Sequence, residues 1–308
     1  MKFIKSIPMA ICGLSLAIAA LGNLLAQNNQ PSLRILCGVL SAIVLIIFLL
    51  KLVFHFPHAG AELKTPIPLS VLPTSTMALM LLCVYIKDYL NESIALVLWY
   101  AAIALHIFIM LLFFKRFIIG FKLGTVFPSW FITFVGIVAV SVSAPAMNAR
   151  PIGQIAFYIG FAFYFIALIL VVLRMLKIKA FPEPARPTIA IYTAPMSLCI
   201  VGYFQSFTQE QRNPALIYIM LAIALISYLY VTVMMIFLLK IKFYPTYAAF
   251  TFPYVISALA FRAGNNFLFA QDCDFFALLT PVSFWIAIAA VLFVIAHYIR
   301  YFRFWLKF

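Results

Sequence analysis

Ten apolar segments without Asp, Glu, Lys or Arg constrain the fold of this chain more than any other feature of its sequence. An α-helix needs about 20 apolar residues to cross a hydrocarbon core of about 30 Å. Inside a bilayer the backbone must satisfy its own hydrogen bonds, which favours helices over irregular chain. The sequence therefore predicts an all-α polytopic membrane protein with ten transmembrane helices, namely Ile7–Ala26, Ile35–Leu50, Ile67–Ile86, Ser93–Phe114, Val126–Ala144, Ile152–Leu173, Thr188–Phe204, Ala215–Leu239, Thr246–Phe261 and Phe275–His297.

The composition supports a membrane protein and excludes a soluble domain. The chain is 67% hydrophobic and 9% charged, whereas soluble domains are about 45–50% apolar and about 25% charged. A net charge of +14 would indicate a nucleic-acid partner in a soluble protein. Here the topology explains the charge, so we expect no nucleic-acid partner.

The basic residues are divided unequally between the two predicted sides of the membrane. Of the 21 Lys and Arg residues, 16 lie at the termini or in the loops after the second, fourth, sixth and eighth segments. The other side holds only five, Arg34, Lys87, Arg150, Arg212 and Arg262. Cytoplasmic loops carry the excess of Lys and Arg, so both termini are predicted to be cytoplasmic. We interpret the apolar start of the chain as a retained first helix, because no small-residue cleavage site ends it.

The odd and even segments differ in chemistry. The five odd segments contain 15 Ser or Thr residues and six prolines, whereas the five even segments contain six Ser or Thr residues and one proline. Helix-breaking prolines are tolerated at membrane depth where neighbouring helices or water satisfy the freed backbone groups. One domain, 1–308, is therefore predicted to contain five hairpins with the odd helix inside and the even helix outside, at about 1–54, 64–116, 122–178, 186–241 and 243–303. Kinked inner helices around an axis would leave a central pore.

Four short motifs in the odd segments carry a family resemblance. They are Ile7-Pro8 with Gly13, Pro73-Thr74-Ser75-Thr76-Met77, Ala194-Pro195 with Cys199 and Tyr203, and Ala249-Phe250-Thr251-Phe252. In this order and spacing, the chain resembles the tellurite-resistance/dicarboxylate transporter family, which includes bacterial TehA proteins and plant slow anion channels.

The resemblance implies a passive anion channel, assembled as a homotrimer in a bacterial cytoplasmic membrane. It also implies that a phenylalanine of the ninth segment blocks the pore, and Phe252 matches that position. Phe250 is the nearest rival, but two positions on a helix differ by about 200°, so only one ring can face the axis. Pro253 follows Phe252 where the bacterial relative carries Gly, so the backbone at this point is expected to be stiffer or differently directed.

Residues at the proline positions are the candidate pore-lining or helix-kink residues: Pro8, Pro73, Thr74, Pro128, Pro195, Ser197, Thr251 and Pro253. Hydroxyl groups, with Ser75, Thr76, Ser129 and Thr193 among them, and backbone N–H groups freed at the kinks could favour anions without a fixed cation. Arg262 is a candidate for an external vestibule charge. Its alternative role is an anchor at the lipid headgroups.

No catalytic, metal or cofactor site is predicted. The segments contain no carboxylate, and we expect the four histidines to be isolated from acids, which leaves an intramembrane enzyme without its machinery. His55 and His58 have a spacing that permits a metal, yet no cluster completes a site. The Asp272-Cys273-Asp274 sequence imitates a sugar-nucleotide motif but lies in a predicted external loop. The other four cysteines are predicted to be buried apolar residues.

Three other functions stay open beside the anion channel. The first is a carrier or efflux protein for C4-dicarboxylates, sulfite or tellurite-related compounds, because fold resemblance does not settle the substrate. A saturable flux would favour the carrier, whereas single-channel steps would favour the pore. The others are a membrane receptor and a scaffold, which should tolerate loss of Pro73 or Pro195 without any change in flux.

Overall fold

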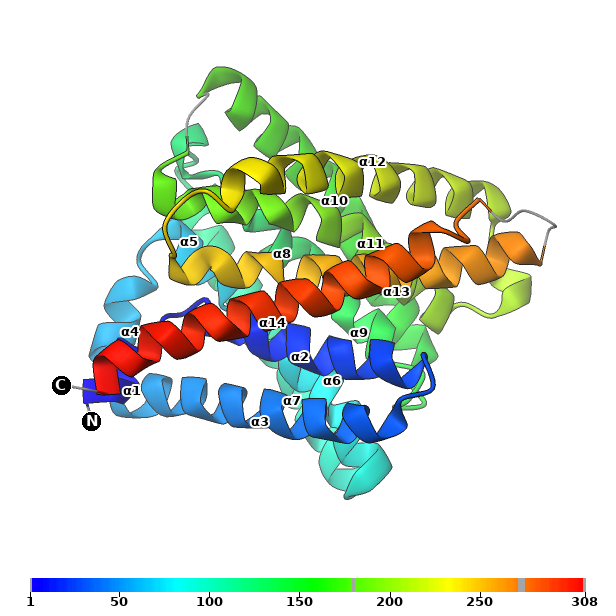
Figure 1. The fold of residues 1–308 in the computed structure, drawn as a ribbon, viewed down its shortest axis with the longest axis horizontal. Helices are drawn as coiled ribbons and strands as arrows, with labels where there is room; N and C mark the ends of the chain where they lie inside the picture. The colour runs from blue at the N-terminus through cyan, green and yellow to red at the C-terminus, as the bar shows by residue number, and fades with distance from the viewer. Residues whose placement is uncertain (1, 179–180, 271–274, 307–308) are drawn as a thin grey trace.

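The computed structural model describes residues 2–178, 181–270 and 275–306, and all regular structure in these ranges is helical (Figure 1). This confirms the predicted all-α class. Both termini lie at the same end of the molecule, which we call the terminal end (Figure 1). Shorter elements occupy the loops: α4 (Phe56–Glu62), η2 (Leu123–Thr125) and η4 (Gln209–Gln211). The π-helical η1 (Phe114–Ile118) continues the preceding helix without a gap.

The even segments form long continuous helices. They are α3 (Pro31–Phe54), α7 (Glu92–Phe113), α10 (Arg150–Lys177), α12 (Pro214–Leu238) and α14 (Leu279–Leu306). Asn91 and Asn213 start α7 and α12 by accepting a hydrogen bond from a backbone N–H of the first turn. In an 18-residue apolar stretch of each of these helices, only 22% to 33% of the residues are buried in the protein. Most of their side chains are therefore left to face lipid.

The odd segments are each broken into two pieces. They are α1 (Lys2–Ser6) with α2 (Ile11–Ala26), α5 (Pro66–Val71) with α6 (Pro73–Tyr89), α8 (Trp130–Val135) with α9 (Val138–Ser143), η3 (Glu183–Thr193) with α11 (Ala194–Ser206), and η5 (Pro245–Phe250) with α13 (Phe252–Phe269). In the corresponding 18-residue stretches of the third and seventh segments, 83% and 89% of the residues are buried. The odd segments therefore form the inner layer.

Seven of the described helices are long and apolar enough to cross a membrane, fewer than the ten predicted. The remaining three predicted spans are odd segments whose helices are too short or too polar to be counted. The helix α2 has 16 residues, and the fifth segment is divided between two helices of six residues each. Arg262, Asn265 and Asn266 make α13 more polar than the even helices.

Consecutive segments pack as hairpins, and the hairpins close into a ring. The helix α2 packs on α3 and α6 on α7, while α13 packs on α14, α11 and α2. The contact of α13 with α2 joins the last hairpin to the first. A buried lysine holds the first hairpin together, because Lys51 Nζ of α3 lies 2.5 Å from the Ile7 carbonyl oxygen at the break in the first segment and 2.6 Å from Glu62 Oε1 of α4.

Tyr85 joins the first two hairpins by close packing. Its hydroxyl donates a hydrogen bond to the Ala19 carbonyl of α2 (2.5 Å), and the Arg34 guanidinium lies over its ring at 4.5 Å. Gly38 of α3 faces the same ring, where a Cβ atom would lie only 2.5 Å from Tyr85 Cδ1. Glycine is therefore required at this position by the close approach of the ring.

We expect Gly38→Ala to destabilise the fold by about 1–3 kcal/mol, since the added methyl group would displace a ring that is fixed on the other side by its hydrogen bond. Gly60→Ala in α4 is the matched control, because a Cβ atom there meets nothing within 4 Å. The measurement is thermal unfolding in detergent. Equal melting temperatures for the two variants would contradict the packing described for Tyr85.

Candidate functional site

A narrow cavity lies where the five odd segments meet. Its volume is about 60 Å³. Its lining comes from every odd segment and from none of the even ones: Ala10, Gly13, Leu16, Val71, Thr74, Met77, Phe131, Ile132, Val135, Gly136, Thr188, Ile191, Ala194, Pro195, Leu198, Thr246, Ala248, Ala249, Phe252 and Pro253. The cavity thus lies on the axis of the inner layer, and its lining is almost entirely apolar.

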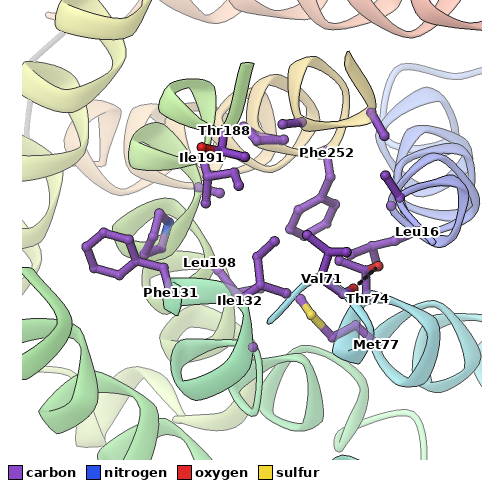
Figure 2. A pocket seen from close by; sticks show the side chains of 18 of the residues that line it. Leu16, Val71, Thr74, Met77, Phe131, Ile132, Thr188, Ile191, Leu198 and Phe252 are labelled. Carbon is purple, nitrogen blue, oxygen red and sulfur yellow. Dashed lines mark hydrogen bonds between the residues drawn. The ribbon is translucent and has the colours of Figure 1, made fainter. Parts of the chain in front are cut away.

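The Phe252 side chain projects into this cavity. Figure 2 shows its ring directed from the start of α13 toward Val71 and Thr74, with Ile132 and Leu198 on the other side. The ring is 8% exposed. Phe250 takes another direction, since it is fully buried and packs on Tyr247 with ring centroids 4.7 Å apart. Of the two rival phenylalanines, only Phe252 therefore lines the cavity.

The predicted prolines stand where inner helices begin. Pro73 is the first residue of α6, and Pro195 and Pro253 are the second residues of α11 and α13. Pro8 and Pro128 lie in the turns before α2 and α8. Proline suits a helix start because the N–H it lacks would have no partner there. Only Pro195 and Pro253 contribute to the cavity lining.

Most of the predicted hydroxyl residues lie off the axis. Thr74 lines the cavity, while its Oγ1 donates to the Val71 carbonyl at 2.7 Å. Ser197 donates to the Thr193 carbonyl (2.8 Å) and Thr251 to the Ala248 carbonyl (2.6 Å), and neither lines the cavity. Ser75, Thr76, Ser129 and Thr193 are likewise buried outside it. These hydroxyl groups satisfy backbone and side-chain groups near the breaks.

A second, more polar pocket lies at the end opposite the termini. The outer ends of all five odd segments line it, together with the start of α3: Asn23, Ala26, Gln27, Arg34, Leu81, Val84, Val142, Pro145, Ala146, Val201, Gln205 and Leu259. We call this pocket the vestibule. Arg34 is its one cation among the described residues, and it pairs with Asp88 at 2.7 Å.

Arg262 lies beside the vestibule and does not line it. It lines a separate pocket between α2, α13 and α14, where its guanidinium donates to Asn28 Oδ1 and to the Gln27 carbonyl. Sequence reasoning missed the vestibule polar residues Arg34, Asn23, Gln27 and Gln205. The amide side chains at the outer ends of two odd segments could have indicated this pocket from the sequence.

The histidines partly depart from the sequence prediction. His58 Nε2 lies 3.1 Å from Glu62 Oε1 one helical turn away, so the expectation that every histidine is isolated from acids was wrong. His106 Nδ1 lies 2.7 Å from Thr76 Oγ1, and His297 Nδ1 lies 2.9 Å from the Phe293 carbonyl oxygen. Within the described ranges no group of three potential metal ligands forms.

The predicted burial of four cysteines is confirmed for Cys12, Cys37, Cys83 and Cys199. The fifth, Cys273, and the Asp272-Cys273-Asp274 sequence lie outside the described residues.

Comparison with known protein families identifies the family of this chain. A family model described as voltage-dependent anion channel matches residues 4–299, almost the whole chain. The chain belongs to the voltage-dependent anion channel family. The resemblance drawn from the four motifs is thereby confirmed, and membership indicates an anion channel or transporter embedded in a lipid bilayer and not an enzyme. A search of curated proteins finds no match to the chain.

Proposed function

We propose that this protein is a passive anion channel whose path runs through the five odd segments and is closed by the ring of Phe252. The observation that carries this proposal is the position of that ring in a cavity lined by all five odd segments. An aromatic ring across a narrow apolar pore excludes water, and an anion that loses its hydration shell without replacement meets a large barrier.

Helix starts supply the attraction for anions that side chains do not. The helices α2, α6, α11 and α13 each begin at or beside a cavity-lining residue: Ala10, Thr74, Ala194 and Phe252. The N-terminus of a helix carries about half a positive charge. The starts of α2 and α13 follow an interruption of the helical backbone and place such charge at the cavity, which favours anions over cations there, as half-helix termini do at transporter sites. By contrast, η3 runs directly into α11, and a single residue separates α5 from α6.

The apolar lining favours a pore over a coupled carrier. Proton- and sodium-coupled carriers usually place carboxylates within their spans, and the cavity lining holds neither an acid nor a base. A C4-dicarboxylate would find no cation in this cavity for either carboxylate. The substrates we propose are therefore inorganic or small organic anions that shed water easily.

The arrangement in the cell is part of the proposal. The predicted charge distribution supports cytoplasmic termini, so the terminal end would face the cytoplasm and the vestibule the outside. We also propose a homotrimer in a bacterial cytoplasmic membrane, on the basis of the resemblance alone. The five hairpins as repeats of one 1–308 domain and the absence of a cofactor remain predictions from the sequence.

We expect Phe252→Ala to convert a nearly silent protein into a conducting one, with an anion current at least about tenfold larger than wild type, which corresponds to about 1.4 kcal/mol off the barrier. The measurement is current across planar bilayers with reversal potentials that follow the anion gradient. Phe250→Ala is the matched control. It should lower stability by about 3–5 kcal/mol, because it empties a fully buried site, and should leave the pore closed.

The proposal would be contradicted if Phe252→Ala were folded and silent. A saturable flux with competition between substrates, in place of channel steps, would indicate the carrier for dicarboxylates, sulfite or tellurite-related compounds.

Selectivity among anions should be shallow and should follow the ease of dehydration, since helix dipoles are weaker attractors than fixed charges. In Phe252→Ala, nitrate should therefore permeate more readily than chloride. The permeability ratio is measured from the reversal potential with nitrate on one side and chloride on the other. A marked preference for chloride would indicate a specific chloride site that this lining does not contain.

A further inference from the structure

The parallel arrangement of the inner helices creates an electrostatic problem at the vestibule. All odd segments run from the terminal end toward the vestibule, so α2, α6, α9 and α11 all end around it. The carboxyl end of a helix carries about half a negative charge, from carbonyl groups without partners. Several such ends at one mouth repel the anions that the cavity attracts.

Basic side chains lie against several of these carboxyl ends. Lys87 of α6 donates to the Ala146 carbonyl (2.6 Å), just beyond the end of α9, and Ala146 lines the vestibule. Glu92 lies 2.7 Å from the same Lys87 nitrogen, so this cation is balanced by a carboxylate.

Arg262 lies against the carboxyl end of α2. Its guanidinium donates to the carbonyl of Gln27, the C-cap residue of α2, which lines the vestibule. Arg262 belongs to α13, so it reaches the helix end of the neighbouring hairpin. No carboxylate among the described residues lies within salt-bridge distance of it.

Arg212 does the same for α11. It donates to the Phe204 carbonyl at 2.7 Å and the Phe207 carbonyl at 3.2 Å, which belong to the last turn and the C-cap of that helix. Gln205, between these residues, lines the vestibule. Arg212 also forms no ion pair with a described carboxylate.

We propose that Arg212 and Arg262 set the potential of the vestibule by offsetting the negative carboxyl ends of α11 and α2, and so determine how easily an inorganic anion enters the path from that side. The inference rests on the proposed channel function. It assigns to Arg262 a role exerted through the end of a neighbouring helix, without a place in the vestibule lining. Both arginines act as positioning and field-setting residues that need not touch the anion.

The size of the effect follows from Coulomb's law. One unit charge acting over roughly 10 Å through water changes the local anion concentration by about twofold. Loss of both arginines should therefore lower anion entry from the vestibule side about fourfold, while entry from the terminal side changes less. The asymmetry should diminish in 1 M salt, where the Debye length falls to about 3 Å.

The experiment uses the full chain with Phe252→Ala as the conducting background and equal chloride on both sides of a planar bilayer. The currents at equal and opposite voltages are compared for Arg212→Gln, Arg262→Gln and the double variant. Glutamine keeps an N–H donor for the carbonyl and removes only the charge. Arg212→Lys and Arg262→Lys are the matched controls, because lysine keeps both the charge and a donor for the carbonyl.

We expect each test variant to reduce chloride entry from the vestibule side about twofold relative to entry from the terminal side. Arg262→Lys and Arg212→Lys should keep the ratio of the Phe252→Ala background. A ratio in the double variant equal to that of the Phe252→Ala protein, when that protein conducts, would overturn this inference alone. A background that does not conduct any anion would overturn the proposed function, and the inference with it.

Discussion

Everything in this structure depends on how broken helices satisfy their backbone within a membrane. A break leaves N–H and C=O groups without partners, and hydrocarbon offers none. The protein places all five breaks in an inner layer and surrounds them with continuous helices that satisfy their own backbone. Buried hydroxyl groups such as those of Ser197 and Thr251 then bond carbonyls beside the breaks.

The same breaks determine the chemistry of the axis. Because the odd segments are interrupted, the starts of α2 and α13 lie at one apolar cavity, and Phe252 is the first residue of α13. Polar character at the axis therefore comes from backbone dipoles and not from side chains. The same arrangement brings the negative carboxyl ends of inner helices together at the vestibule, where Arg212 and Arg262 lie against two of them.

Much of the fold could be predicted because hydropathy and charge report on it directly. Even helices such as α10 carry their charges only near the ends, and the unequal distribution of Pro and hydroxyl residues identified the inner layer. The direction of individual side chains was less accessible. A stretch of 3₁₀-helix, such as η5 before Thr251, changes the rotation per residue, so helical spacing alone does not say which side chains face the axis.

At the candidate site, too, some features could be predicted from the sequence and others are decided only by packing. Phe252 was found from a motif, and the structure directs its ring into the cavity, whereas Thr251 next to it bonds its own backbone. Arg262 was expected in the vestibule, but that pocket holds Arg34 instead. Both arginines lie on the predicted outer side. Only the packing of α3 and α13 around α2 decides which one reaches the axis, and a single sequence does not contain that information.

The central claim, that anions pass through the cavity between the odd segments, is tested most directly by blocking it. Single cysteines are introduced into the Phe252→Ala background at Ala194, which lines the cavity, and at Ala101, which is exposed on the outer helix α7. A negatively charged thiol reagent is then added while the anion current is recorded, with the parent protein as the reference. The account predicts that the reagent abolishes the current of Ala194→Cys and spares that of Ala101→Cys. An unaffected current in a fully labelled Ala194→Cys protein would place the anion path elsewhere.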